Sequence, residues 1–357
     1  MPQIYLAVSA HGYGHLAQAA AVVNRLAECL PGLSLTLQTT LADDVLRRFI
    51  SIPFEKIDLA PDFGMLMDNA LDVRVDESLA AYRELHARWE EQLASQARPL
   101  EQTRPDLVLA NIPYVVLATA ARLDIRAAAL CSLNWAEIFQ GICNGLPGVD
   151  PIYQDMLHAY AGARVFLRPA PSMPMPGLRN ARDIGPIARL SPQRRPELQQ
   201  VLGLAPKTRL IALSMGGMST PLPLDAWPKF PNCFWLVPPD QPVDRPDMRH
   251  WTELGFHLID ILASCDALVT KPGYGSVAEA VCNGVPVLYV ERGNWPEEPY
   301  LVGWLEQQGR ALKISRADLE AGRLFEPLDQ LWRMPPKPPL APTGIEEAVT
   351  VLLDLLG

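Results

Sequence analysis

Short apolar runs alternate with longer amphipathic stretches through the first half of the chain. The apolar runs have the length of strands and lie at residues 4–9, 33–38, 107–110 and 127–131. The stretches with helical spacing lie at residues 14–29, 42–49, 77–96 and 114–122. Strands of a parallel sheet are buried on both faces and are therefore continuous in apolar residues. This order predicts an α/β half in which helices connect the strands of a parallel sheet.

The same alternation starts again in the second half of the chain. Strands are predicted at residues 210–214, 233–237, 267–270 and 285–290. Helices are predicted at residues 256–264, 276–282, 299–308 and 344–356. A chain of 357 residues also exceeds the usual size of a single core. We therefore expect two Rossmann-like domains built on one plan.

A run of prolines separates the two halves. Between residues 168 and 176 proline occupies nearly every second position, which no helix or central strand tolerates. Proline-rich segments form stiff connectors between domains. The predicted organisation is an N-terminal domain at residues 1–168, a linker at 169–186, a C-terminal domain at 187–340, and a C-terminal helix at 341–357 that packs back across the domain junction.

Composition and charge exclude several classes of protein. Hydrophobic residues make up 49% of the chain and charged residues 20%, as in a globular protein. The net charge of −9 argues against a nucleic-acid partner. The N-terminus lacks a signal peptide and no segment has about 18 continuous apolar residues, so we expect a cytoplasmic protein without a membrane span, with peripheral membrane contact left open. The six cysteines lack the spacing of metal sites and are expected to be reduced core thiols.

The first candidate site is the loop at residues 9–15, between the first strand and the first helix. Gly12 and Gly14 let backbone amides approach a ligand, and the helix that follows directs its positive end at an anion there. His15 lies in the first turn of that helix, where the dipole lowers its pKa and leaves a neutral base. His11 has the same chance as His15 of facing a ligand, but it does not lie at the start of the helix. A tight turn without a ligand is the alternative interpretation.

The second candidate site is the loop at residues 271–279, Lys-Pro-Gly-Tyr-Gly-Ser-Val-Ala-Glu, between a strand and a helix. Its glycines favour close approach by a phosphate or a ribose. Glu279 is placed to accept hydrogen bonds from the two hydroxyls of a ribose. The alternative is structural, because Ser276 and Glu279 also have the spacing of a capping box, in which the glutamate binds its own helix start.

These loops resemble motifs of a known class of enzymes. Residues 271–279 and 294–300, the latter Asn-Trp-Pro-Glu-Glu-Pro-Tyr, are similar to the nucleotide-sugar half of GT-B glycosyltransferases, and most of all to the glycosyltransferase-like N-terminal part of plant L-arabinokinases. A more distant resemblance is to the bacterial cell-wall transferase that adds N-acetylglucosamine to lipid I. Residues 11–15 and 133–135 resemble matching segments of these families. The resemblance implies an α/β fold of the GT-B type, with two Rossmann-like parallel-sheet domains facing across a cleft.

The resemblance also implies which residues bind the nucleotide-sugar donor. The donor motif comprises Lys271, Gly273, Tyr274, Gly275, Ser276, Glu279 and Asn294, with Ser276 near the diphosphate and Glu279 on the ribose. The residues that match the holders of the sugar hydroxyls are Glu297 and Glu298, where the cell-wall enzyme has amides. The loop around the diphosphate corresponds to Ser214, Gly216 and Gly217, and the base is expected at Phe256, His257 and Leu258. UDP is the favoured nucleotide, with dTDP and GDP open.

His15 matches the histidine that deprotonates the acceptor hydroxyl in nucleotide-sugar transferases of plants. Those enzymes orient this histidine with an aspartate at the end of a later strand, where this chain has Asn111. An asparagine fixes a tautomer but does not stabilise an imidazolium by charge. No D-x-D motif lies at a strand end, and Asp43 and Asp44 are expected to complement a helix dipole rather than bind a metal. The implied reaction is an inverting, metal-independent transfer that requires no cofactor.

Other functions stay open beside the transferase. A nucleotide-sugar epimerase or hydrolase on the same fold needs extra carboxylates, which Glu297 and Glu298 supply. A non-catalytic nucleotide-sugar-binding protein fits the departure at Asn111. A sugar kinase is not expected, because the resemblance ends with the transferase-like part of arabinokinases. Trp135 and Phe139 line an acceptor groove or, more often for aromatics at this spacing, belong to the core. The acceptor, the sugar and the oligomeric state do not follow from the sequence.

Overall fold

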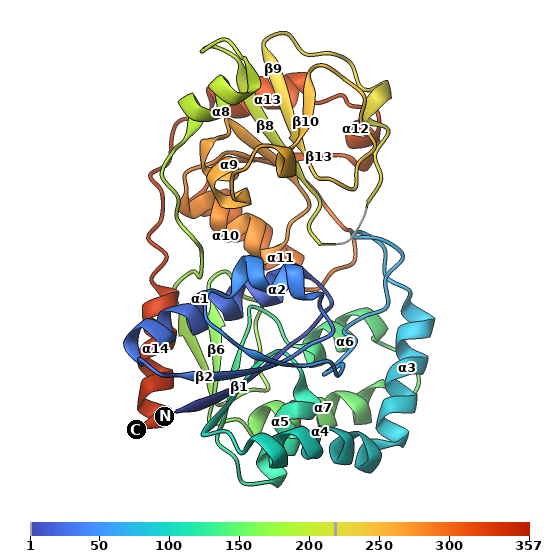
Figure 1. The fold of residues 1–357 in the computed structure, drawn as a ribbon. Helices are drawn as coiled ribbons and strands as arrows, with labels where there is room; N and C mark the ends of the chain where they lie inside the picture. The colour runs from blue at the N-terminus through green and yellow to red at the C-terminus, as the bar shows by residue number, and fades with distance from the viewer. Residues whose placement is uncertain (1, 218–219) are drawn as a thin grey trace.

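The computed structural model describes residues 2–217 and 220–357 as two stacked α/β halves (Figure 1). In the described residues, the first half holds a seven-stranded sheet in the order β3-β2-β1-β4-β5-β6-β7, and the second a six-stranded sheet in the order β10-β9-β8-β11-β12-β13. All neighbouring strands of both sheets pair in parallel. Each sheet has helices on both faces, so the expected α/β architecture with two Rossmann-like sheets is confirmed.

The elements of the first half follow the alternation of the sequence. Its strands are β1 (Gln3–Val8), β2 (Ser34–Gln38), β3 (Glu55–Ile57), β4 (Leu107–Asn111), β5 (Ala127–Leu130), β6 (Val165–Pro169) and β7 (Ala181–Ile184). Its helices are α1 (Tyr13–Cys29), α2 (Asp43–Phe49), α3 (Val75–Ala87), α4 (Trp89–Thr103), α5 (Tyr114–Arg122), α6 (Trp135–Cys143) and α7 (Val149–Ala161). Helices α1 and α2 cover one face of the sheet, and α3 to α7 cover the other.

The second half repeats the plan with shorter elements. Its strands are β8 (Arg209–Ser214), β9 (Cys233–Val237), β10 (Met248–His250), β11 (Ala267–Thr270), β12 (Val287–Val290) and β13 (Ala311–Ile314). Its helices are α8 (Arg195–Leu202), α9 (Leu258–Ser264), α10 (Tyr274–Cys282), α11 (Glu298–Gln308), α12 (Arg316–Glu320) and α13 (Phe325–Arg333). Short 3-10 turns occupy Leu224–Ala226 and Trp251–Glu253.

Strand β1 shows why the apolar runs become central strands. Ile4, Leu6 and Val8 pack into the core beneath α1, while Tyr5 and Ala7 pack into the core on the opposite face. All five side chains are fully buried. Removing one such aliphatic side chain from water contributes about 1.5–3 kcal/mol, so a strand that is apolar at every position gains from both faces.

The predicted linker is placed too early in the chain. The proline-rich segment belongs to the first half, because Met173 and Met175 are buried in its core. Strand β7 follows at the edge of the first sheet and pairs with β6. Proline is tolerated next to an edge strand, where one side of the ladder has no partner to satisfy. The chain passes to the second half between β7 and α8, at residues 185–194.

Three further predictions need correction. The stretch predicted as one helix at residues 77–96 forms two, α3 and α4, separated at Arg88. The helix predicted to begin at Ser276 begins instead at Tyr274, with Gly273 at its N-cap. All six cysteines are free thiols, but Cys29 is exposed rather than buried in the core.

The last helix, α14 (Gly344–Leu356), returns to the first half (Figure 1). Its buried residues Ala348, Val349 and Leu352 join the core that contains α1. The backbone N–H of Gly344 donates a hydrogen bond to Pro186 O, 3.0 Å away. The chain thus crosses between the halves twice. Among the described residues, none of the helices combines the length and the hydropathy that spanning a bilayer requires.

Candidate active site between the two halves

Both candidate loops lie where the strand order of a sheet reverses. In the first sheet β1 pairs with β2 on one side and β4 on the other, and Val8 at the end of β1 lies beside Asn111. In the second sheet β8 pairs with β9 and β11, which places Ser214 beside Thr270. Open α/β sheets bind ligands at the carboxyl ends of strands at such a switch point. The topology therefore supports the predicted location of both loops.

His15 is held by partners from the first sheet. It is the third residue of α1, whose N-cap is Gly12, and its side chain is buried. His15 Nδ1 lies 2.9 Å from Asn111 Oδ1 and 3.6 Å from the Cys131 sulfur. The hydrogen bonds of the His15 side chain in the described part of the chain involve Nδ1, which leaves Nε2 for another partner. Burial lowers the pKa of His15 to about 4, although the bond to Asn111 opposes the shift.

A row of hydrogen bonds connects this histidine to the second half. Asn111 Nδ2 donates to Gln18 Oε1 at 3.3 Å, and Gln18 Nε2 donates to Ser132 Oγ at 3.3 Å. Ser132 Oγ then donates to Glu297 Oε1 of the second half at 2.7 Å. The other carboxylate oxygen, Oε2, accepts from Trp295 Nε1 at 3.3 Å. Burial raises the pKa of Glu297, and the two donors oppose that shift.

His11 lies among aromatic rings from both halves. Its ring stacks on Trp295 at 5.7 Å between centroids, and meets Trp135 edge to face at 5.0 Å. The His11 and His15 rings are 6.4 Å apart. His11 Nε2 is buried and has no hydrogen-bond partner among the described residues. Burial, with smaller repulsion from His15, Arg292 and Lys271, holds the pKa of His11 well below its usual value.

The glycine loops of the second half surround a lysine. A Cβ added to Gly273 would lie 3.1 Å from Lys271 Nζ, and one added to Gly216 would lie 3.4 Å from the same atom. Gly216 and Gly217 are exposed, and Gly273 is half-buried. Burial and the nearby Arg292 hold the pKa of Lys271 well below its usual value. The loops thus present backbone groups and the Lys271 amine to any ligand at this switch point.

The loops of the two halves touch each other. A Cβ added to Gly217 would lie 3.0 Å from the ring of Tyr13 at the start of α1. A Cβ added to Gly141 would lie 2.6 Å from Pro296 Cγ, so this approach requires a glycine. Gly12 and Gly14, by contrast, have open space where their side chains would be. The first loop can therefore admit a ligand atom at these two positions.

Glu279 pairs with an arginine rather than with the start of its own helix. Because α10 begins at Tyr274, Ser276 is the third residue of the helix and does not cap it, and Gly275 lies inside the helix. The capping box is therefore excluded. Glu279 Oε1 instead accepts a hydrogen bond from Arg189 Nε at 2.8 Å. Arg189 also places its guanidinium over the Phe49 ring, 5.1 Å from its centroid.

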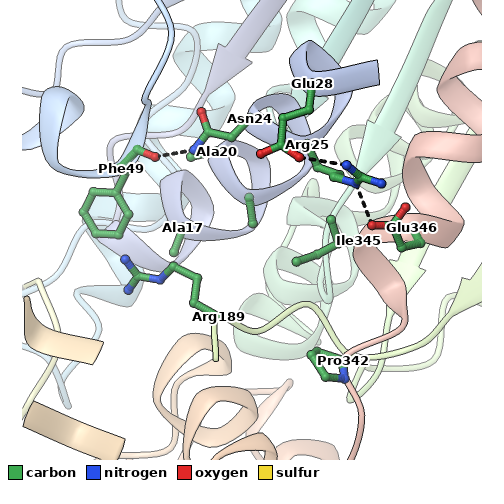
Figure 2. Close-up of a pocket in the computed structure, with 11 residues that line it drawn as sticks. Ala17, Ala20, Asn24, Arg25, Glu28, Phe49, Arg189, Pro342, Ile345 and Glu346 are labelled. Carbon is green, nitrogen blue, oxygen red and sulfur yellow. Dashed lines mark hydrogen bonds and ion pairs between the residues drawn. The ribbon is translucent and has the colours of Figure 1, made fainter. Parts of the chain in front are cut away.

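Arg189 lines a pocket of about 330 Å³ at the junction of the halves (Figure 2). Figure 2 shows Arg189 facing Phe49, with Ala17 and Asn24 of α1 and Ile345 of α14 around the same space. The predicted donor residues are not among those that line this pocket. Arg189 nevertheless connects it to Glu279, which is half-buried.

The other predicted donor residues are dispersed. Tyr274 is buried, accepts a hydrogen bond from Ile187 N at 2.8 Å and donates one to Ala170 O at 3.1 Å, so it joins the halves. Asn294 is exposed. Glu298 is buried and accepts from Arg292 N through both oxygens, at 3.0 and 3.1 Å. At the start of α9, His257 and Leu258 are exposed and Phe256 lies beneath the Arg194 guanidinium at 4.5 Å.

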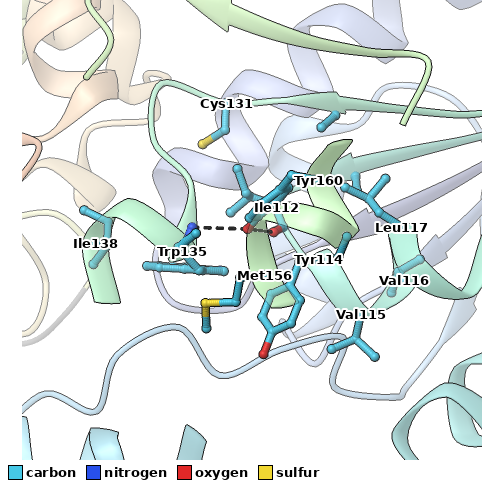
Figure 3. Close-up of a cluster of buried hydrophobic side chains, with 14 of the residues drawn as sticks. Ile112, Tyr114, Val115, Val116, Leu117, Cys131, Trp135, Ile138, Met156 and Tyr160 are labelled. Atoms are coloured by element: carbon cyan, nitrogen blue, oxygen red, sulfur yellow. Dashed lines mark hydrogen bonds between the residues drawn. The ribbon is translucent and has the colours of Figure 1, made fainter. Parts of the chain in front are cut away.

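Trp135 and Phe139 belong to the core, which was the more frequent of the two interpretations of their spacing. Trp135 and Phe139 are fully buried. Figure 3 shows Trp135 in an apolar cluster, where its backbone N–H donates to the Tyr160 hydroxyl at 3.1 Å and that hydroxyl donates to Ile112 O at 2.8 Å. The Trp135 indole still meets the His11 and His15 rings, so it forms a wall of the site.

Several residues of this site were missed by the sequence analysis. They are Gln18, Asp62, Ser132, Arg189 and Arg292. Asp62 accepts a hydrogen bond from Trp135 Nε1 at 2.7 Å, and burial raises its pKa to about 6. Arg292 stacks on Trp295 at 4.8 Å and its Nε has no hydrogen-bond partner among the described residues. None of these residues lies in a motif.

Asp43 and Asp44, at the start of α2, form ion pairs with nearby basic residues. Asp44 pairs with Arg48 at 2.9 Å, and Asp43 with Lys56 at 3.1 Å. Within residues 2–217 and 220–357, no cluster of three His, Cys, Asp or Glu side chains is arranged to hold a metal ion. The metal-independent reaction stays a prediction.

Comparison with known proteins identifies the fold. No family model matches the chain. L-arabinokinase of Arabidopsis thaliana is 26% identical over 334 residues, which are 92% of this chain and 32% of that protein, so the chain spans about a third of this relative. The glycosyltransferase of kitacinnamycin shares a TM-score of 0.64 at 14% identity, with 99% of this chain and 95% of that chain covered.

Two further solved structures have a similar fold. CalG4, the calicheamicin glycosyltransferase, has a TM-score of 0.59 at 16% identity, covering 100% of this chain and 94% of that chain. A UDP-glucosyltransferase from Polygonum tinctorium has a TM-score of 0.58 at 16% identity, covering 99% and 98%. The chain therefore has the GT-B fold, and the resemblance to GT-B glycosyltransferases and to arabinokinase is confirmed.

Proposed function

We propose that this protein is a glycosyltransferase that moves a sugar from a nucleotide-diphosphate sugar to an acceptor hydroxyl. One observation carries the proposal. Hydrogen bonds through Gln18 and Ser132 connect the His15–Asn111 pair at one switch point to Glu297 of the other half, so the proposed base and the proposed sugar-binding carboxylate belong to one network across the junction. The GT-B fold and its glycosyltransferase neighbours support this assignment.

The donor binds along the second sheet in this proposal. The exposed backbone of Gly216 and Gly217 and the amino-terminal end of α10 receive the diphosphate, with Lys271 as the charged partner. Glu279 leaves Arg189 and accepts the ribose hydroxyls. UDP is the favoured nucleotide, and the start of α9 holds its base.

The chemistry is a single in-line displacement with inversion. His15 Nε2 removes the proton from the acceptor hydroxyl as its oxygen bonds to the anomeric carbon. The bond from that carbon to the diphosphate oxygen breaks, and the diphosphate leaves with the electron pair. Lys271 and the amides of the glycine loops stabilise the leaving group without a metal ion. Asn111 orients the imidazole but contributes no charge to the imidazolium.

Ligand screening and one substitution test the proposal. A ligand that binds only the folded state stabilises it more the more tightly it binds. UDP is the favoured nucleotide, so it should raise the unfolding temperature more than dTDP or GDP. With a UDP-sugar and an acceptor panel, His15→Ala should lower turnover about a hundredfold or more. His158→Ala, at an exposed position of α7, is the matched control. Equal turnover by His15→Ala and the native protein would remove the histidine from the mechanism.

A non-catalytic nucleotide-sugar-binding protein is the second candidate. It is favoured by the contacts that occupy the junction, namely the His11–Trp295 stack and the Arg189–Glu279 ion pair. This candidate predicts that UDP or a UDP-sugar binds, while no donor is consumed with or without an acceptor. Release or epimerisation of the sugar in the absence of an acceptor would instead indicate a hydrolase or an epimerase.

A further inference from the structure

The hydrogen bonds between His15 and Glu297 have a fixed direction. The row runs through Asn111, Gln18 and Ser132, and it links two halves of the molecule that are far apart in sequence. An asparagine or a glutamine can turn its amide by half a rotation and exchange donor for acceptor. The row therefore needs one end at which only one direction is allowed.

Glu297 is that end. The Ser132 and Trp295 donors and the nearby Arg292 and Lys271 favour the ionised form of Glu297. An ionised carboxylate only accepts hydrogen bonds, and here Ser132 donates to one oxygen and Trp295 to the other. The indole N–H of Trp295 only donates. Ser132 has one hydroxyl proton, and the 2.7 Å contact with Glu297 uses it. Ser132 can then only accept from its other neighbour, Gln18.

The side-chain amides of Gln18 and Asn111 extend the fixed direction of these hydrogen bonds from Ser132 to His15. Since Ser132 accepts, Gln18 must present Nε2 to it and Oε1 to Asn111. Asn111 must then present Nδ2 to Gln18 and Oδ1 to His15. An amide oxygen only accepts, so the proton between them lies on His15 Nδ1. His15 Nε2 is left with a free lone pair.

We propose that Glu297 sets the tautomer of His15 across the domain junction, with Ser132, Gln18 and Asn111 as positioning residues. The inference rests on the proposed function, because it concerns the same histidine. It assigns to Glu297 a task beyond holding a sugar. It also makes the competence of the base depend on contact between the halves, since the Ser132–Glu297 bond is the step of the row that crosses from one half to the other.

Nitrogen NMR of the full-length protein, labelled at its six histidines, tests the proposal near neutral pH without any donor. The signals of His15 are assigned as those missing from His15→Gln. In the native protein Nδ1 should carry the proton and Nε2 should resonate as an unprotonated nitrogen. Ser132→Ala removes the link, and the ratio of the two tautomers should fall by about tenfold, the value of roughly one net hydrogen bond.

Glu297→Gln provides a second variant of the same shape. Its amide can donate or accept, so it also should lower the tautomer ratio. Glu298→Gln is the matched control, because this neighbouring buried carboxylate binds Arg292 N and has no place in the row. It should leave His15 as in the native protein. Unchanged signals from the other histidines and a single unfolding transition show that each variant is folded.

Two results overturn the inference. One is a native His15 that carries its proton on Nε2. The other is a tautomer ratio that stays at the native value in both Ser132→Ala and Glu297→Gln. Turnover measurements keep this test separate from the proposed function. If the native protein turns over a donor but the His15 tautomer ratio is unchanged in both variants, the inference alone is refuted. If the native protein consumes no donor but the tautomer ratio falls in the variants, the transferase alone is refuted.

Discussion

The ion pair between Arg189 and Glu279 should compete with the nucleotide. Glu279 accepts Arg189 Nε at 2.8 Å in the structure, and the proposed ribose hydroxyls need the same carboxylate. We expect Arg189→Met to bind UDP more tightly than the native protein, because the carboxylate is then free before the nucleotide arrives. Methionine retains an apolar contact with the Phe49 ring beneath Arg189.

The size of the effect follows from the exposure of the pair. The side chains of Arg189 and Glu279 are 34% and 13% exposed, so solvent screens their attraction. An ion pair of this kind contributes about 1 kcal/mol or less. Since 1.4 kcal/mol corresponds to a factor of ten, the dissociation constant for UDP should fall by up to about fivefold. The gain should shrink as salt is added, because salt weakens the pair in the native protein.

Titration calorimetry with UDP at fixed ionic strength measures this change. Arg25→Met is the matched control, since Arg25 lines the same pocket but pairs with Glu28 and Glu346. Its affinity for UDP should equal that of the native protein. Glu279→Gln should bind UDP more weakly, and adding Arg189→Met to it should give no further gain. Native or weaker affinity in Arg189→Met would show that Glu279 does not exchange Arg189 for the ribose.

Two titratable groups give further predictions. Because burial lowers the pKa of His15 to about 4, kcat/KM should be level near neutral pH and fall as the pH drops through about 4. A fall centred near pH 6.5 would refute a buried neutral base. Burial raises the pKa of Asp62 from 3.8 to about 6, so the folded state binds more protons between these values and loses stability as the pH rises through them. Thermal unfolding should therefore show Asp62→Asn more stable than the native protein by roughly 1–3 kcal/mol above pH 6, and similar at pH 4; a difference independent of pH would contradict this.

The strands and the two loops could be predicted because their signals are local. β1 and β4 are continuous apolar runs, since both faces of each strand are buried. The glycines at positions 12, 14, 216 and 273 mark the ends of strands at which a loop turns into the site. The edge strand β7 was missed, because the prolines before it suggested a linker and its burial is partial.

The contacts inside the site could not be predicted, because they join residues far apart in sequence. Gln18 and Ser132 are 114 positions apart, and Ser132 and Glu297 are 165 apart. A glutamine on a helix and a serine after a strand carry no pattern that distinguishes them from surface residues. Arg189 lies in the true connection between the halves, where its pairing with Glu279 depends on how the second sheet is placed. Only the packed halves bring these groups together.

Asn111 in place of an aspartate changes how the base of this site must be prepared. An aspartate accepts from the histidine in either orientation of its carboxylate, so a His–Asp pair sets its own tautomer. An amide offers an oxygen in one orientation and a donor in the other, so Asn111 needs a further partner to choose between them. Gln18 is that partner, but it is also an amide with the same ambiguity. The choice is settled only at Ser132 and Glu297, across the junction. Because Asn111 is an amide, the tautomer of His15 depends on the contact between the two halves. A carboxylate at position 111 would set the tautomer without that contact.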